Sequence, residues 1–145
     1  MNDDPTVKER ACPNQMTICR AGAAIRRMSD DIASGPFWAE LLLESSRDGE
    51  NTAMRVTVDP GIVTHWHTHP RGQLLYVLSG VGQVQRDGGA IEEVRAGDCV
   101  WFAPGERHWH GATPSSTFSY VSIQAVENGT AVHWMEPVSI GRVQS

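Results

Sequence analysis

Several residue types are scarce in this chain of 145 residues, and their scarcity excludes whole classes of protein. Only one of the twelve basic residues is a lysine, and the eleven arginines are scattered, with no basic run that would follow a phosphate backbone. The net charge at pH 7 is −5. We therefore expect no nucleic-acid partner.

Long apolar runs are also absent. No stretch approaches the roughly 18 apolar residues of a membrane-spanning helix, and residues 1–10 are too polar for a signal peptide. These absences predict a soluble, cytoplasmic protein with no membrane partner.

Cysteine is the third scarcity. Cys12, Cys19 and Cys99 are odd in number and lack a CxxC spacing, which argues against a disulfide framework and a thiolate metal site. Cys99 lies in an apolar run, so we expect it to be buried.

The length fits one domain, preceded by an irregular arm. Residues 1–20 are polar and interrupted by Pro5 and Pro13, which predicts the arm, and residues 21–145 form the domain. Residues 37–43 are an apolar run that would suit an edge strand. Because such an edge needs covering, we expect a homodimer.

From residue 51 onward the pattern is one of short strands separated by turn residues. Alternating or apolar segments end at Pro-Gly, Asp-Gly-Gly and Asn-Gly sequences, which favour turns and hairpins. Strands are predicted at residues 52–58, 74–78, 81–86, 90–95, 99–103, 117–126 and 131–135. Many closely spaced strands with no long helix indicate an all-β fold, a sandwich or barrel of the jelly-roll kind.

Three histidines at alternate positions are the most distinctive local feature. His65, His67 and His69 share one face of an extended strand, with successive members roughly 6.5 to 7 Å apart. One metal ion therefore cannot bind the outer pair together. The spacing leaves both neighbouring pairs open.

Two longer motifs resemble those of the cupin family. The first has Gly61, His67, His69, Gln73 and Gly80 at the family spacing, with glutamine where most cupins have glutamate. The second begins at Gly97 and reaches Pro104, Gly105 and His108. The resemblance implies a single-domain β-barrel (a double-stranded β-helix) and selects His67 and His69 over His65.

The segments WHTHPRGQ (66–73), RDGGAIEEVRAGDCVWFAPGERHWHGATP (86–114) and HWMEPV (133–138) resemble the small single-domain cupins that include the manganese-dependent bacterial hydroxynitrile lyases. The resemblance implies that His67, His69, Gln73 and His108 hold a metal, and that His110 is catalytic. Tyr120 stands where those lyases have a second histidine near the pocket. Tyr120 is therefore a second candidate catalytic residue, although an ordinary phenol, with a pKa near 10, is better suited to the pocket wall.

The donor set also indicates the chemistry. Three neutral imidazoles and a neutral amide leave a divalent ion its full charge, which strengthens it as a Lewis acid. Four protein ligands leave two positions open on a six-coordinate ion. We expect Mn²⁺ first, then Fe²⁺, while nitrogen-rich ligands also suit Ni²⁺ or Zn²⁺.

Two strands supply the expected pocket. Met54 and Val56 share a face of one strand, and Phe118, Tyr120 and Gln124 share a face of another. His65 is expected at the pocket mouth. The pocket would be apolar with a few polar groups and would suit a small-molecule substrate.

The leading functional hypothesis is a metal-dependent enzyme of the hydroxynitrile lyase type, in which His110 moves a proton. Two alternatives use the same residues: an iron-dependent dioxygenase, and a non-catalytic metal-dependent small-molecule binding protein.

Overall fold

The computed structural model describes residues 9–139. Ten β-strands and a three-residue 3₁₀ helix, η1 (Asp30–Ile32), form this part of the chain. The strands are β1 (Ile25–Arg27), β2 (Trp38–Leu43), β3 (Asn51–Val58), β4 (His67–Thr68), β5 (Gln73–Arg86), β6 (Glu92–Arg95), β7 (Cys99–Phe102), β8 (His108–Ala112), β9 (Phe118–Ala125) and β10 (His133–Trp134). The prediction of an all-β fold is confirmed.

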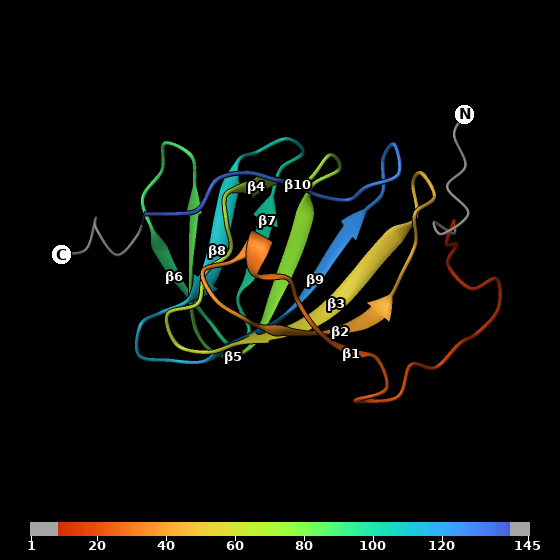
Figure 1. The fold of residues 1–145 in the computed structure, drawn as a ribbon, viewed down its shortest axis with the longest axis horizontal. Helices are drawn as coiled ribbons and strands as arrows, with labels where there is room; N and C mark the ends of the chain where they lie inside the picture. Colours follow the sequence, from red (N-terminus) through yellow and green to blue (C-terminus); the bar gives the residue numbers. More distant parts are fainter. Residues whose placement is uncertain (1–8, 140–145) are drawn as a thin grey trace.

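The strands form one strongly curled, antiparallel sheet (Figure 1), in the order β1-β2-β3-β9-β5-β8-β4-β10. The 14-residue strand β5 is its centre. The first part of β5 pairs with β7 and β9, and the second part pairs with β6 and β8. The strand thus joins the half of the sheet that contains β3 and β9 to the half that contains β4 and β8.

Two glycines permit this change of partners. Gly80 has a φ of +76°, and a Cβ atom there would collide with the backbone of Thr117. A Cβ atom on Gly82 would collide with the ring of Phe118. A side chain at either position would collide with β9 or with the residue that precedes it, so this close approach requires glycine. The predicted strands 74–78 and 81–86 are accordingly a single strand.

The interior is filled from the alternating faces of β3, β5 and β9. Val56 and Val58 of β3, Leu75 and Val77 of β5, and Phe118 of β9 are all buried. The register places Val56 opposite Tyr120 and Val58 opposite Phe118. This apolar core extends to the buried polar side chains, because Val56 and Tyr120 of the core also line the cavity that the histidines border.

The edge of the sheet differs from the expectation. Residues 37–43 were expected to form an edge strand, yet β2 pairs with β1 on one side and with β3 on the other. Apolar side chains remain exposed on the outer surface, among them Trp38, Tyr76 and Trp101. The homodimer stays a prediction.

Two further expectations concern the arm and Cys99. The predicted arm, residues 1–20, lies partly outside the described residues; from residue 9 to residue 20 it contains no helix or strand, and the main chains of Arg10 and Ser46 form a hydrogen bond. The prediction for Cys99 is wrong, because its side chain lies on the exposed face of β7. No helix within residues 9–139 is long and apolar enough to span a membrane.

Candidate metal centre

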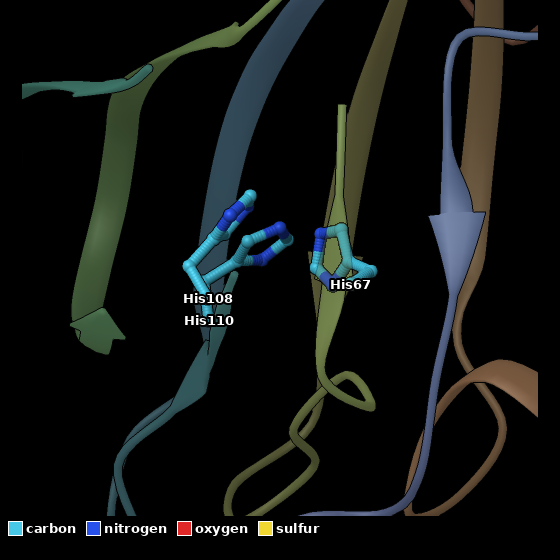
Figure 2. A group of neighbouring side chains, drawn as sticks. All are labelled: His67, His108 and His110. Atoms are coloured by element: carbon cyan, nitrogen blue, oxygen red, sulfur yellow. The ribbon is translucent and has the colours of Figure 1, made fainter. Parts of the chain in front are cut away.

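Three histidines converge from two neighbouring strands. The antiparallel pairing of β4 and β8 places His67 opposite His108, and His110 lies on the same face of β8, two residues further on. Figure 2 shows the His108 and His110 rings side by side and directed toward the ring of His67. One ring nitrogen from each lies within 4.8 Å of the other two, and all three side chains are buried. The β4–β8 register thus builds the centre of the site.

His69 and Gln73 lie beside this cluster. The His69 ring centroid is 5.0 Å from that of His67 and 5.4 Å from that of His108. Gln73, the first residue of β5, places its Oε1 atom 3.4 Å from Nε2 of His108. Both side chains are buried. The four residues expected to hold a metal therefore lie together in the structure.

Hydrogen bonds fix the orientation of three imidazoles. Nδ1 of His67 lies 2.8 Å from the carbonyl oxygen of His65, that of His69 2.6 Å from the carbonyl of Ala131, and that of His108 2.8 Å from the carbonyl of Glu106. Because a carbonyl only accepts, Nδ1 carries the proton and Nε2 keeps its lone pair. Nε2 of His67 and of His69 is buried without a partner. This arrangement fits a divalent cation held by Nε2 atoms.

His110 is held differently. Both of its ring nitrogens are buried and neither has a hydrogen-bond partner, so no neighbour fixes its tautomer. Proximity groups His110 with His67 and His108, whereas the hydrogen bonds group His69 with them. The hydrogen bonds determine which nitrogen offers a lone pair, so His69 is the better candidate ligand and His110 is a candidate for another role.

Burial keeps the histidines neutral. Loss of hydration lowers the pKa of His69 to about 4 and that of His108 to about 3. The same cause, with neighbouring imidazoles second, lowers the pKa values of His67 and His110 well below the ordinary value. Burial also raises the pKa of Tyr120. At neutral pH the imidazoles are therefore uncharged and the phenol keeps its proton.

A cavity of about 130 Å³ opens beside the histidines. Met54, Val56, Gln124 and Tyr120 line it, together with His110. His65 and Phe118, which were expected at the pocket, do not: the carbonyl of His65 contacts His67, and Phe118 is buried in the core. The cavity combines an apolar wall with a cluster of polar atoms at one end.

Sequence reasoning missed three residues that shape the site. Phe102 stacks on the ring of His108 with centroids 3.6 Å apart, and the ring of Trp134 lies 4.5 Å from that of His67. Thr52 bonds to the side chain of Gln124. Thr52 precedes Met54 by two positions on one strand, so alternation alone could have placed it on the same face. The sequence contains no comparable signal for Trp134, which reaches the site from β10.

A family model described as a cupin domain matches residues 54–124. A cupin-like protein of Thermotoga maritima has a solved structure that superposes with a TM-score of 0.72 and 30% identity, covering 81% of this chain and 90% of that chain. The polyketide cyclase of Streptomyces resistomycificus superposes with a TM-score of 0.68 over 86% of this chain and 89% of that chain, at 20% identity, which supports the fold alone.

An (R)-mandelonitrile lyase of Granulicella tundricola is 55% identical over 84 residues, which are 58% of this chain and 64% of that protein. The matched region therefore spans a little under two thirds of that relative's length. Over these 84 residues the identity of 55% is higher than the 30% and 20% found for the two proteins of solved structure.

Proposed function

The chain belongs to the cupin family, and we propose that it is a metal-dependent enzyme of the hydroxynitrile lyase type, which cleaves or forms the carbon–carbon bond of a cyanohydrin. One observation carries the proposal: buried imidazole nitrogens without partners converge at the end of an apolar cavity. Buried polar atoms are normally paired, so unpaired ones at a cavity support a role in holding a cation or a small molecule. The similarity to an (R)-mandelonitrile lyase supports this choice of reaction.

His67, His69 and His108 would hold the cation through Nε2, and Gln73 through Oε1. When bound there, a divalent ion supplies a Lewis acid that stabilises negative charge on an oxygen or on cyanide. We propose Mn²⁺. The neutral donors of this chain leave that charge uncompensated, and the burial of all four side chains keeps bulk water away from it.

His110 would move the proton. In the cleavage direction, one of its ring nitrogens accepts the hydroxyl proton of the cyanohydrin as the carbon–carbon bond breaks, which yields an aldehyde. The imidazolium then returns that proton to the cyanide, so His110 ends the cycle neutral. Its two unpartnered nitrogens and its place in the cavity lining suit this role. Tyr120, whose ring packs edge-on against that of His110 at 5.2 Å, would limit the movement of the imidazole.

The cavity sets the substrate class. Its volume of about 130 Å³ accommodates one small aromatic ring or a short aliphatic chain. Met54, Val56 and Ile32 offer it apolar contact, and Ser122 and Gln124 place polar atoms on the same wall. We therefore propose an aromatic or aliphatic cyanohydrin of about the size of mandelonitrile as the substrate.

The test begins with the metal. Purified protein is analysed for bound elements, stripped with a chelator and reconstituted separately with Mn²⁺, Fe²⁺, Ni²⁺ and Zn²⁺. We expect mandelonitrile cleavage, followed as benzaldehyde and cyanide release, to appear with Mn²⁺ and to fall by about 10²- to 10⁴-fold in His110→Ala. Cyanide release that is the same in His110→Ala and in the parent protein would remove the proposal. Oxygen uptake with Fe²⁺, without cyanide release, would identify a dioxygenase instead.

A further inference from the structure

The side chain of Gln73 poses a problem that a glutamate would not. A carboxylate offers an oxygen on either side, whereas an amide offers an oxygen on one side and an NH₂ group on the other. Only the oxygen can bind a cation. A buried glutamine at this position therefore needs a neighbour that determines which end faces the histidines.

A chain of hydrogen bonds crosses three strands from Gln73. Nε2 of Gln73 donates to Oε1 of Gln124 at 2.9 Å, and both side chains are buried. Nε2 of Gln124 donates to Oγ1 of Thr52 at 2.6 Å and lies 3.3 Å from the carbonyl oxygen of Thr52. The β3–β9 register pairs Thr52 with Gln124, so the backbone holds these two residues opposite each other.

The direction of this chain is set at its Thr52 end. The carbonyl oxygen of Thr52 can only accept. The hydroxyl proton of Thr52 is already used, because Oγ1 donates to the main-chain carbonyl of Gln124 at 3.0 Å. Both oxygens of Thr52 thus require a donor, and the amide of Gln124 must present its nitrogen to them.

The orientation of the Gln124 amide determines the orientation of the Gln73 amide. Because the Gln124 amide directs its nitrogen toward Thr52, its oxygen faces Gln73. Gln73 must therefore donate from its Nε2 atom to that oxygen. The remaining atom, Oε1 of Gln73, then points at His108, 3.4 Å from its Nε2. Inverting the Gln73 amide alone would set its Oε1 against Oε1 of Gln124, and inverting both amides would set Oε1 of Gln124 against the two oxygens of Thr52. Either inversion would present the NH₂ group of Gln73 to the cation.

We propose that Gln124 and Thr52 are positioning residues that fix the polarity of the Gln73 amide, so that its oxygen faces the metal. The inference rests on the metal site proposed above. Gln124 thereby acts on the ion through Gln73 while it also lines the substrate cavity. Because the ligand is an amide and not a carboxylate, residues of β3 and β9 contribute to its orientation.

The test measures Mn²⁺ affinity of the full chain without substrate, by titration followed through the EPR signal of free Mn²⁺. Gln124→Leu is expected to weaken binding by about 10- to 100-fold, the effect usual for losing a group that orients a ligand. Thr52→Val is expected to weaken it by about tenfold, and Thr52→Ser, which keeps the hydroxyl, to retain the parent affinity. Thermal unfolding of the metal-free variants controls for folding.

Repeating Gln124→Leu in a Gln73→Glu protein distinguishes an effect on amide orientation from a general effect on side-chain packing. In Gln73→Glu both oxygens are equivalent, and one of them meets Oε1 of Gln124. Adding Gln124→Leu there removes a repulsion, so we expect Mn²⁺ binding to be unchanged or tighter, opposite to its effect beside the native glutamine. Equal weakening in both backgrounds, or none beside Gln73, overturns the proposal. Failure of the parent protein to bind Mn²⁺ overturns the metal site as well, whereas a failure confined to the Gln124 and Thr52 variants overturns the positioning role alone.

Discussion

The two walls of the cavity differ in what holds their polar atoms. On the histidine wall, which comprises the lining residues His67, His69 and His110 and the neighbouring His108, three rings are oriented by main-chain carbonyls. On the β3–β9 wall, which comprises Met54, Val56, Tyr120, Ser122 and Gln124, side chains orient side chains, and Ser122 has no partner for its hydroxyl.

The two walls should therefore respond differently to substitutions. A main-chain carbonyl is present whatever side chain its residue carries. We therefore expect the ring orientations to tolerate substitutions of His65, Ala131 and Glu106, provided that the backbone conformation is kept. The β3–β9 wall depends on the identity of each side chain. Substitutions there should alter substrate choice and the fine structure of the metal site, while substitutions on the histidine wall should abolish the site.

The largest expected effect comes from His67→Ala, compared with His65→Ala. His67 supplies an Nε2 atom at the centre of the cluster, whereas His65 contributes only its main-chain carbonyl. We expect His67→Ala to lose the metal and His65→Ala to keep it. Elemental analysis after gel filtration measures both, and equal loss in the two variants would contradict the assignment of ligands.

The next prediction compares the loss of kcat in Tyr120→Phe with that in His110→Ala. Burial raises the pKa of Tyr120, so its hydroxyl keeps its proton at neutral pH. Tyr120→Phe should therefore change kcat for mandelonitrile by less than about tenfold, well short of the 10²- to 10⁴-fold loss expected for His110→Ala. Steady-state kinetics of the two variants provide the comparison. A larger loss in Tyr120→Phe would move the proton transfer to the β3–β9 wall.

Acid should unfold the metal-free protein through the histidine wall. The folded pKa values of His69 and His108, about 4 and about 3, lie below that of an unfolded histidine, near 6.5. Between those values the unfolded chain binds more protons, so stability is fully present above about pH 6.5 and is lost as the pH falls toward 4. Each histidine contributes up to about 1.4 kcal/mol per pH unit.

Urea unfolding of the metal-free protein at pH 7, 6 and 5 measures this dependence. His69→Gln should flatten it. A slope in His69→Gln equal to that of the parent protein would locate the acid sensitivity elsewhere.

The smallest effect is expected from Ser122→Ala. The hydroxyl of Ser122 is buried and has no partner, so its removal deletes an unsatisfied group and leaves a void of only one atom. We expect the free energy of unfolding to change by less than about 0.5 kcal/mol or to rise. A clear loss of stability would show that the hydroxyl has a partner. Weaker substrate binding with unchanged stability would mark the hydroxyl as a substrate contact.

Much of the fold could be predicted because its signals are local. Alternation in residues 52–58 and 117–126, and the Asp-Gly-Gly turn, determine the strands and a hairpin from neighbouring residues alone. The break expected between residues 78 and 81 does not occur, because Gly80 serves a close approach to Thr117 rather than a turn. The exposure of Cys99 was missed for a related reason: an apolar run does not say which face of a strand meets the core.

The sequence by itself indicated the candidate donor types and the absence of a carboxylate among them. His67, His69, Gln73 and His108 were expected as ligands because two motifs resemble those of the cupin family, whereas strand spacing alone left His65 and His69 as alternatives beside His67. Only the tertiary structure decided which atoms of those residues are free. The carbonyls of Ala131 and Glu106 that orient two of the rings, and the Thr52–Gln124 pair that orients the amide, come from segments distant in sequence or carry no side-chain signal. Their positions follow from strand register, which is a property of the folded chain.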